Sequence, residues 1–241
     1  MIVNTPLVNP PPSNLAFDLA QAVRHLSERD EVLKELIAAA APFEIDVTGE
    51  ESPYEVLLES IAYQSISGKA AATIYGRIKA LGENGRAPTP EKMLKIPMAK
   101  LRKAGFSRAK VLAAKDLAKK AIAGIVPTHE EAIKLADEEL VERLICVRGI
   151  GAWTVEMFLI FRLGRPDVLP IHDLGVKKGW CVAYKRKHMP HPKELLKFGE
   201  RWRPYRTVAS WYMWRAFERA GYKVTNKIQH RKPRKRKKKV A

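Results

Sequence analysis

The chain is poor in cysteine, with only Cys146 and Cys181 among its 241 residues. Two thiols cannot form a disulfide framework, and they cannot hold an iron–sulfur cluster, which needs four cysteine ligands. The sequence also lacks an apolar run of about eighteen residues and any pattern typical of a signal peptide. We therefore expect an intracellular, soluble protein whose cysteines are reduced and either buried or without a role.

Strand patterns are lacking too, because no segment alternates apolar and polar residues and no internal repeat is found. Helical periodicity begins near Leu15 and continues to about Ala41. Further helices are predicted at 53–64, 67–81, 90–95, 98–103, 108–123, 129–135, 137–146, 172–184, 192–200 and 204–220. The sequence therefore predicts an all-α protein, in one domain or two small lobes. Residues 1–14, rich in Pro and Asn, are predicted to form an extended arm.

Acidic residues are few beside basic ones, 26 against 44, which gives a net charge of +18. The charge is also segregated: residues 1–60 carry −8, residues 61–226 carry +17, and residues 227–239 carry +9 without a single acid. A positive field of this size favours a polyanion, most simply nucleic acid. The low-complexity residues 227–241 are predicted to be a disordered basic tail, serving DNA binding, nuclear targeting or solubility.

A tight turn, Gly149-Ile150-Gly151, separates two apolar helical segments. The first segment ends at Val147, and the second is predicted to run from Trp153 to Gly164. A glycine hairpin that opens a helix exposes backbone N–H groups and the positive end of the helix dipole. The expected ligand is a DNA phosphate. A dinucleotide-binding loop is discarded, because no strand precedes the glycines and no third glycine follows.

Five segments carry a resemblance to a known family. They are, in chain order, SPYEVLLESIAYQSISGKAA (52–71), AGFSRAK (104–110), GIGAWT (149–154), DVLPIHDLGVKKG (167–179) and ERWRPYRTVASWYMWRAFE (200–218). Together they resemble the helix–hairpin–helix DNA glycosylases and, within them, the DNA-3-methyladenine glycosylase II family of alkylation repair. One departure is His172, which stands where this family often has a second Asp beside the catalytic one.

The resemblance implies a two-lobed helical fold. A middle lobe would span 53–168 and include the helix–hairpin–helix motif at about 137–164. A terminal lobe would combine 15–52 with 169–226, and the active cleft would lie between the lobes. The chain is too short at its N-terminal side for the β-rich domain that bacterial members often carry. Some members of the superfamily hold an iron–sulfur cluster, which this chain cannot. We expect a monomer that needs no cofactor.

Asp173 matches the catalytic position of this family. Cleavage of a glycosidic bond builds positive charge on the sugar, and a nearby carboxylate can stabilise that charge or orient a water. One carboxylate is sufficient for alkylated purines, which are already cationic and leave readily. The alternative is that Asp173 merely caps the helix that starts at Leu174, and both interpretations can hold together.

Three residues match the base pocket of the family: Trp153, Met157 and Trp214. Relatives that also cleave the DNA strand carry a lysine at the position of Trp153, whose amine forms a Schiff base. A tryptophan predicts a monofunctional hydrolase. Trp214 matches the residue that stacks on the extruded base through its indole face. Burial in the core is the alternative for each of the three.

DNA contacts are implied at the hairpin and at a second loop. The matching positions are Gly149, Gly151, Trp153 and Thr154 in the hairpin, and Gln64, Ser65, Ile66 and Ser67 in the loop. In relatives this loop enters the minor groove and fills the gap left by the extruded base. Ser65 aligns with the usual plug but is small, so Ile66 could help; a helix–helix turn capped by Ser65 or Ser67 is the alternative.

Two parts of the sequence offer groups that could bind a metal ion. In relatives the hairpin carbonyls hold a monovalent or similar cation, and here these would be the carbonyls of Ile145, Val147 and Ile150. Cys181, His188 and His191 could suggest zinc, but the set is short of ligands and its segment is rich in proline. Surface histidines explain them better.

The resemblance implies excision of alkylated purines, of the 3-methyladenine and 7-methylguanine type, from double-stranded DNA, which leaves an abasic site. The sequence does not rank these bases against hypoxanthine or ethenoadenine. A helix–hairpin–helix module that only binds DNA is one alternative, and a glycosylase for oxidised or mismatched bases is another. The protein is expected at the DNA, in a nucleoid or a nucleus, and not at a membrane.

Overall fold

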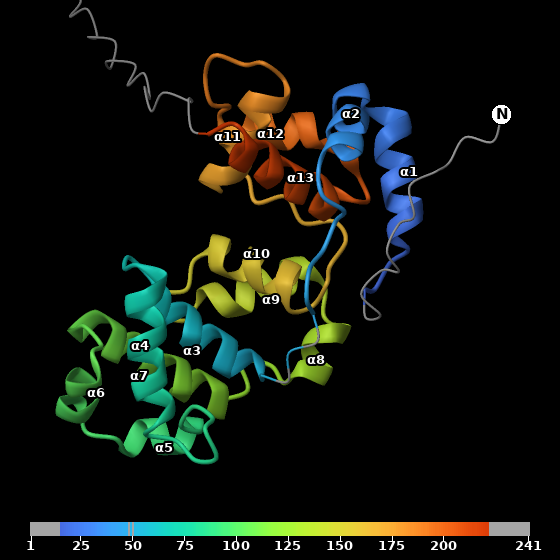
Figure 1. The fold of residues 1–241 in the computed structure, drawn as a ribbon. Coiled ribbons are helices and arrows are strands. Elements are labelled where there is room, and N and C mark those ends of the chain that lie inside the picture. Colours follow the sequence, from blue (N-terminus) through green and yellow to red (C-terminus); the bar gives the residue numbers. More distant parts are fainter. Residues whose placement is uncertain (1–14, 48, 50, 222–241) are drawn as a thin grey trace, which may run out of the picture.

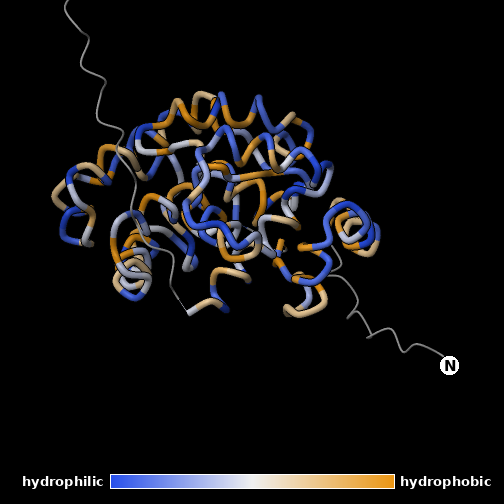
Figure 2. The backbone as a smooth tube through the Cα atoms, turned by 90° about the horizontal axis from the view of Figure 1, so that it is seen from above, coloured by the Kyte–Doolittle hydropathy of each residue, from blue (hydrophilic) through white to orange (hydrophobic). Residues whose placement is uncertain are grey.

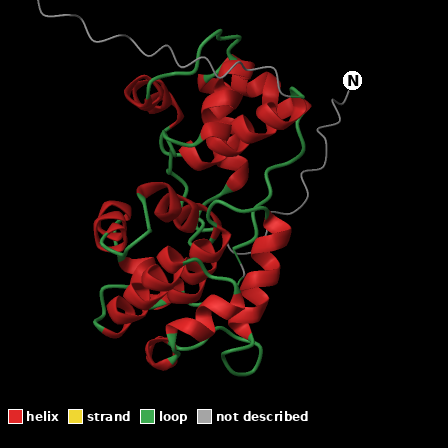
Figure 3. Cartoon of the chain, turned by 90° about the vertical axis from the view of Figure 1, so that its left-hand side faces the viewer, coloured by secondary structure: helices red, strands yellow, loops and turns green. Residues whose placement is uncertain are grey.

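The computed structural model describes residues 15–47, 49 and 51–221, and in these residues it contains thirteen α-helices, one 3₁₀ helix and no strand. Figures 1 and 3 show the helices, joined by loops, in two groups. The all-α prediction is confirmed. The predicted N-terminal arm (1–14) and basic tail (227–241) lie outside the described residues.

The larger group contains the helices from the middle of the chain. These are α3 (Pro53–Tyr63), α4 (Gly68–Lys79), α5 (Pro90–Lys95), α6 (Met98–Ala104), α7 (Arg108–Ile122), α8 (His129–Lys134), α9 (Asp137–Ile145) and α10 (Ala152–Phe161). Their apolar faces enclose one core, in which Leu57, Ile61, Leu117 and Val155 have no exposed surface. We call this group the middle lobe.

The second group joins the two ends of the described chain. It contains α1 (Leu19–Arg29), α2 (Glu31–Ala39), α11 (Leu174–Ala183), α12 (Pro192–Gly199), the 3₁₀ helix η1 (Glu200–Trp202) and α13 (Arg206–Arg219). Its separate core includes Leu26, Leu33 and Trp202, all fully buried. Figure 1 shows α1 and α2 beside α11–α13, and we call this group the terminal lobe.

Most helices are amphipathic, and hydrophobic and hydrophilic residues alternate around them in Figure 2. The sequence places their starts well because polar caps mark them. Ser52 and Glu55 form a reciprocal capping box at α3, and Ser107 caps α7. Helices α3–α13 begin and end within three residues of the predicted positions; the largest difference is α10, which ends at Phe161 rather than at Gly164.

The helical stretch predicted from Leu15 to Ala41 is interrupted at Asp30. This residue has an extended backbone and ends α1, while its carboxylate caps α2 by accepting the Leu33 N–H at 3.2 Å. The same carboxylate accepts bonds from the Tyr184 hydroxyl at 2.7 Å and from the Trp202 indole N–H at 3.1 Å. Partners more than 150 residues away therefore stabilise the buried Asp30 and the break between the helices.

The segment that links α10 to α11 is fixed by α13. Arg206 donates to the Asp167 carboxylate with Nε 2.7 Å from Oδ1, and the Thr207 hydroxyl donates to the Arg165 carbonyl at 2.6 Å. The Val168 N–H in turn donates to the Thr207 hydroxyl at 3.0 Å. These bonds hold the chain just before Asp173 at the boundary between the two lobes.

Candidate active site and DNA-binding hairpin

Asp173 lies at the N-cap of α11, where three N–H donors hold its carboxylate. Oδ1 accepts the backbone N–H of Val176 at 2.7 Å and the indole N–H of Trp214 at 2.8 Å. Oδ2 accepts the indole N–H of Trp153 at 2.8 Å. Asp173 therefore caps its helix and is also bound by both tryptophans that the resemblance places in the pocket. Trp153 comes from α10, and Trp214 comes from α13, so both lobes fix the orientation of this carboxylate.

Trp214 is partly buried, and Phe161 covers one face of its indole at a centroid distance of 5.7 Å and an interplanar angle of 23°. Its edge reaches Asp173 only because residue 175 is glycine. A Cβ at Gly175 would lie 2.7 Å from Trp214 Cδ1 and 3.1 Å from Asp173 Oδ1. The clearest role of Trp214 in this arrangement is to donate a hydrogen bond to the carboxylate.

Trp153 is 48% exposed, which is unusual for an indole that serves only the core. Its side chain lines a cavity of about 360 Å³ together with Ser60, Tyr63, Gln64, Ser65, Thr154 and Met157. The cavity thus unites predicted pocket residues with the predicted plug loop, while Trp214 is not part of its lining. Met157 is partly buried and also packs against the core of the middle lobe.

The hairpin between α9 and α10 is closed by backbone bonds, Val147 N–H to the Leu144 carbonyl and Ile150 N–H to the Val147 carbonyl, both at 3.0 Å. Gly149 has a φ of +80°, which a residue with a side chain rarely adopts. Gly151 is the N-cap of α10, and no side chain of the described residues caps this helix. The N–H groups at the start of α10 are therefore available to an anion.

Thr154 is held within the start of α10, and its predicted contact with DNA stays a prediction. Its side chain is buried, and its N–H donates to the Gly151 carbonyl at 2.9 Å. Among the predicted cation ligands, the Val147 carbonyl already accepts the Ile150 N–H, and the Lys120 ammonium donates to the carbonyl of Cys146, which lies between Ile145 and Val147. Carbonyl oxygens are suitable ligands for a hard cation. A cation held by the carbonyls of Ile145, Val147 and Ile150 stays a prediction.

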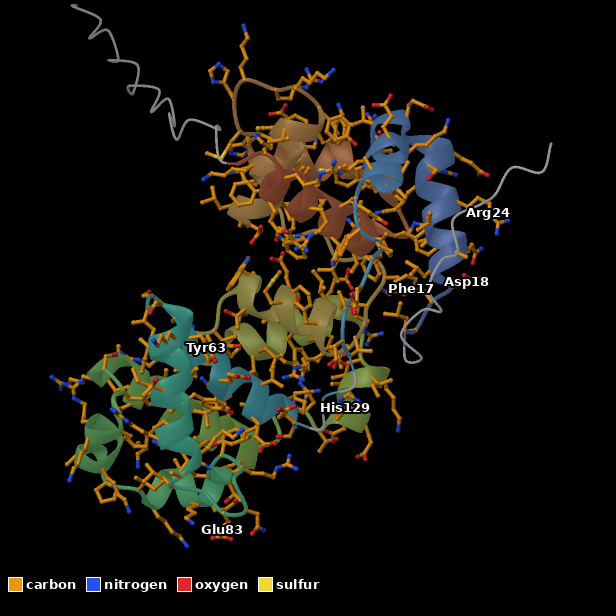
Figure 4. All side chains as sticks on the ribbon, in the orientation of Figure 1. Phe17, Asp18, Arg24, Tyr63, Glu83 and His129 are labelled. Carbon is orange, nitrogen blue, oxygen red and sulfur yellow. The ribbon has the colours of Figure 1, made fainter. Side chains whose placement is uncertain are left out.

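The predicted plug loop joins α3 to α4. Ser67 caps α4 by accepting the Ala70 N–H at 3.4 Å, so the turn interpretation describes this residue. Ser65 has a left-handed backbone with a φ of +59°, and Ile66 points outward with 39% of its surface exposed. The Gln64 amide donates to the Gly149 carbonyl at 2.8 Å and so ties the loop to the hairpin. Tyr63, labelled in Figure 4, lies at the start of this loop.

Two residues of the site were missed by the sequence reasoning. Arg148 is exposed at the tip of the hairpin, next to the predicted phosphate site. Its signal was a cation directly before the Gly-x-Gly turn. Glu156 lies one helical turn beyond Trp153, and burial together with the charge of Asp173 raises the pKa of its carboxyl to about 7. Its Oε2 is buried without a hydrogen-bond partner among the described residues, and its signal was a single acid in the apolar segment WTVEMFLIF.

Cys181, His188 and His191, the residues weighed as zinc ligands, make contacts of other kinds. The Cys181 thiol is buried and donates to the His188 carbonyl at 3.2 Å, while His191 caps α12. Cys146 is a free cysteine and is exposed, so of the two only Cys181 is buried. Within the described ranges, no group of three or more His, Cys, Asp or Glu could hold a metal ion. None of the described helices is long and apolar enough to span a membrane.

Comparison with known proteins adds independent evidence. Residues 58–204 match the family model of the HhH-GPD superfamily of base excision DNA repair proteins. DNA-3-methyladenine glycosylase 1 of Schizosaccharomyces pombe is 40% identical over 209 residues, which cover 86% of this chain and 92% of that protein. The alkylbase DNA glycosidase-like protein mag2 of the same organism is 31% identical, over 82% of this chain and 93% of its own length.

Solved structures of similar proteins belong to the same group of enzymes. The S. pombe 3-methyladenine DNA glycosylase in complex with abasic DNA aligns with a TM-score of 0.75 and 39% identity, covering 84% of this chain and 99% of its own. A DNA-3-methyladenine glycosidase from Bacillus halodurans aligns with a TM-score of 0.75 and 30% identity, covering 86% of this chain and 92% of its own. The chain belongs to the HhH-GPD superfamily of base excision DNA repair proteins and, within it, to the DNA-3-methyladenine glycosylase family.

Proposed function

We propose that this chain is a monofunctional DNA glycosylase that flips alkylated purines, of the 3-methyladenine and 7-methylguanine type, out of double-stranded DNA and hydrolyses their N-glycosidic bond. The observation that carries the proposal is the Asp173 carboxylate, held between the indole N–H groups of Trp153 and Trp214 at 2.8 Å each. A module that only binds phosphate would have no use for a carboxylate fixed in this way.

The chemistry follows from that carboxylate. As the bond between the sugar carbon and the base nitrogen breaks, the electron pair leaves with the base and positive charge develops on the sugar. Asp173 stabilises this charge or orients the water whose oxygen then bonds to the carbon while the water gives up a proton to solvent, and the products are a free base and an abasic site. An alkylated purine is already cationic, so it leaves as a neutral base without protonation by a second acid.

The cavity beside Trp153 receives the extruded base. Its volume of about 360 Å³ lies within the usual range for small-molecule sites, roughly 300–1,000 Å³. The exposed face of Trp153 offers stacking and a cation–π contact to a positively charged purine. Met157 and Tyr63 add apolar walls. Trp214 acts through Asp173, and only the part of its surface that Phe161 leaves uncovered remains for a stacked base.

DNA is held at two places in this proposal. The N–H groups of Gly149 and Gly151 bind a backbone phosphate, to which the exposed Arg148 adds a positive charge. Ile66 and Ser65 enter the gap that the flipped base leaves. Residue 153 is not a lysine, so the chain lacks the amine for strand cleavage at this position. The protein acts as a monomer at chromosomal DNA, in a nucleoid or a nucleus.

The test is release of free bases from methylated duplex DNA, resolved by chromatography. The wild-type chain is expected to release alkylated purines, and Asp173→Asn is expected to release none while still binding duplex DNA. Asp18→Asn is a matched control, because Asp18 also caps a helix through its carboxylate, at α1 (Figure 4), and should excise like the wild type. Wild-type base release by Asp173→Asn would remove this carboxylate from the mechanism. DNA binding without any release by the wild type would favour the non-catalytic module.

A further inference from the structure

Two charged side chains of α7, which the proposed mechanism does not use, form hydrogen bonds to the backbone of the hairpin proposed to bind DNA. The Asp116 carboxylate accepts the backbone N–H of Arg148 with 2.7 Å between N and Oδ2. The same oxygen accepts the Lys120 ammonium at 2.7 Å, and that ammonium also donates to the Cys146 carbonyl. The two side chains therefore bind backbone groups on both sides of Val147, next to Gly149.

An exposed i,i+4 ion pair usually contributes little to stability, but this pair differs from that case. The side chains of Lys120 and Asp116 are only 23% and 29% exposed. Each makes a second bond, to backbone that has just left a helix. Cys146 is the C-cap of α9, where carbonyls lack partners within the helix and a cation is favourable for the helix dipole.

We infer that Asp116 and Lys120 are positioning residues that hold the hairpin in its phosphate-binding shape before DNA arrives, an inference that rests on the proposed role of the hairpin. The pair does not itself contact the phosphate. It fixes the peptide groups before Gly149, so that the N–H groups of Gly149 and Gly151 and the side chain of Arg148 need not be ordered by the ligand. A preorganised site avoids that ordering cost, and the gain appears as affinity.

The expected signature is a loss of DNA affinity with an unchanged rate of chemistry. The Asp173 oxygens are bound by residues of α10, α11 and α13, none of which Asp116 or Lys120 contacts through the bonds described above. Single-turnover excision at saturating enzyme should therefore remain as in the wild type. The protein concentration that half-saturates binding to DNA should rise instead.

The experiment compares Lys120→Ala with Lys119→Ala in the full chain. Lys119 is the adjacent, exposed residue of α7, so its removal deletes the same charge without touching the hairpin. The probe is a duplex that carries a tetrahydrofuran abasic-site analogue, with binding measured at fixed salt. Lys120→Ala is expected to weaken binding about tenfold, as for the loss of a hydrogen bond from a charged group, and Lys119→Ala less than about threefold. Equal losses in both variants would overturn the inference.

A second readout addresses the hairpin directly. In Asp116→Ala the Arg148 amide loses its acceptor, so its hydrogen exchange should accelerate while amides of the α3 core remain protected. Unchanged exchange at Arg148 would also overturn the inference. If Lys120→Ala unfolds, Lys120→Gln replaces it, because it removes the charge and keeps a polar side chain; its binding should be weakened more than that of Lys119→Ala and by up to about tenfold, and a loss equal to that of Lys119→Ala refutes the inference. Failure of base release with intact probe binding would refute the proposed function alone.

Discussion

Replacement of Trp214 by Phe separates two roles that a tryptophan beside a catalytic carboxylate can play. The substitution deletes the indole N–H that donates to Asp173 Oδ1 at 2.8 Å. It keeps an aromatic ring that can still stack on Phe161, as the indole does at 5.7 Å. If Trp214 acts by orienting the carboxylate, Phe should be a poor substitute. If it acts by stacking on the base, Phe should be a good one.

The magnitude follows from the bonds around Asp173. A hydrogen bond to a charged group contributes about 1.5–3 kcal/mol, and each 1.4 kcal/mol or so corresponds to a factor of about ten in rate. The Val176 and Trp153 donors remain in the variant, so the carboxylate is loosened rather than released. We expect single-turnover excision by Trp214→Phe to fall about ten- to a hundredfold.

The assay is excision of an alkylated purine at saturating enzyme, with affinity for an abasic-analogue duplex measured in parallel. Affinity should stay within about twofold of the wild type, because the lost N–H faces Asp173 and not the phosphate backbone. Trp214→Ala should be slower still, since it also removes the ring that packs on Phe161. Wild-type excision by Trp214→Phe together with a large loss in Trp214→Ala would refute the orienting role and restore base stacking.

Three further predictions concern other parts of the molecule. No covalent protein–DNA adduct should form with borohydride on an abasic product, because position 153 carries an indole and not an amine; a lysine-dependent adduct would contradict the monofunctional proposal. The pKa of Glu156 is raised to about 7 from its usual 4.5, so the folded state binds more protons than the unfolded state between these values, and stability falls as the pH rises through this window. Glu156→Gln should therefore melt at a higher temperature than the wild type at pH about 8 and at a similar temperature at pH about 4.5, and an identical difference at both values would contradict the assignment. Deletion of residues 227–241, nine of which are Lys or Arg, should weaken non-specific DNA binding and flatten its dependence on salt, whereas an unchanged slope would favour a targeting or solubility role.

The fold was predictable because its signals are local. Caps such as Ser52, Ser107 and Asp173 stand directly before the helices that they start, and glycines mark the hairpin. The break at Asp30 was not predictable in this way. Asp30 interrupts a continuous helical pattern because its carboxylate meets Tyr184 and Trp202, and nothing in the sequence near residue 30 reports those partners.

In the candidate site, too, the identity of the residues was predictable, whereas their contacts across the fold were not. The resemblance selected Asp173, Trp153 and Trp214, and the structure places them together. The resemblance could not show that both indoles turn their N–H groups to the carboxylate, since this depends on how closely α11 approaches α13. That approach is set by Gly179 as well as Gly175, because a Cβ at Gly179 would lie 1.8 Å from the Met213 carbonyl oxygen. The spacing of residues along a chain does not contain such distances.

Because the donors to Asp173 come from both lobes, the placement of the lobes connects DNA binding with cleavage of the glycosidic bond in the proposed function. Trp153 belongs to α10, which follows the hairpin proposed to bind DNA, whereas Trp214 belongs to the terminal lobe, and each donates to one carboxylate oxygen. The carboxylate is therefore aligned only when the two lobes keep their relative placement, which the bond between Arg206 and Asp167 helps to hold at 2.7 Å. A phosphate bound at the start of α10 would contact Gly151, which stands two positions before Trp153 in the sequence. Under the proposed function, the same short helix places the DNA backbone and the Asp173 carboxylate in one frame, so that a flipped sugar would meet Asp173 without further rearrangement of the protein.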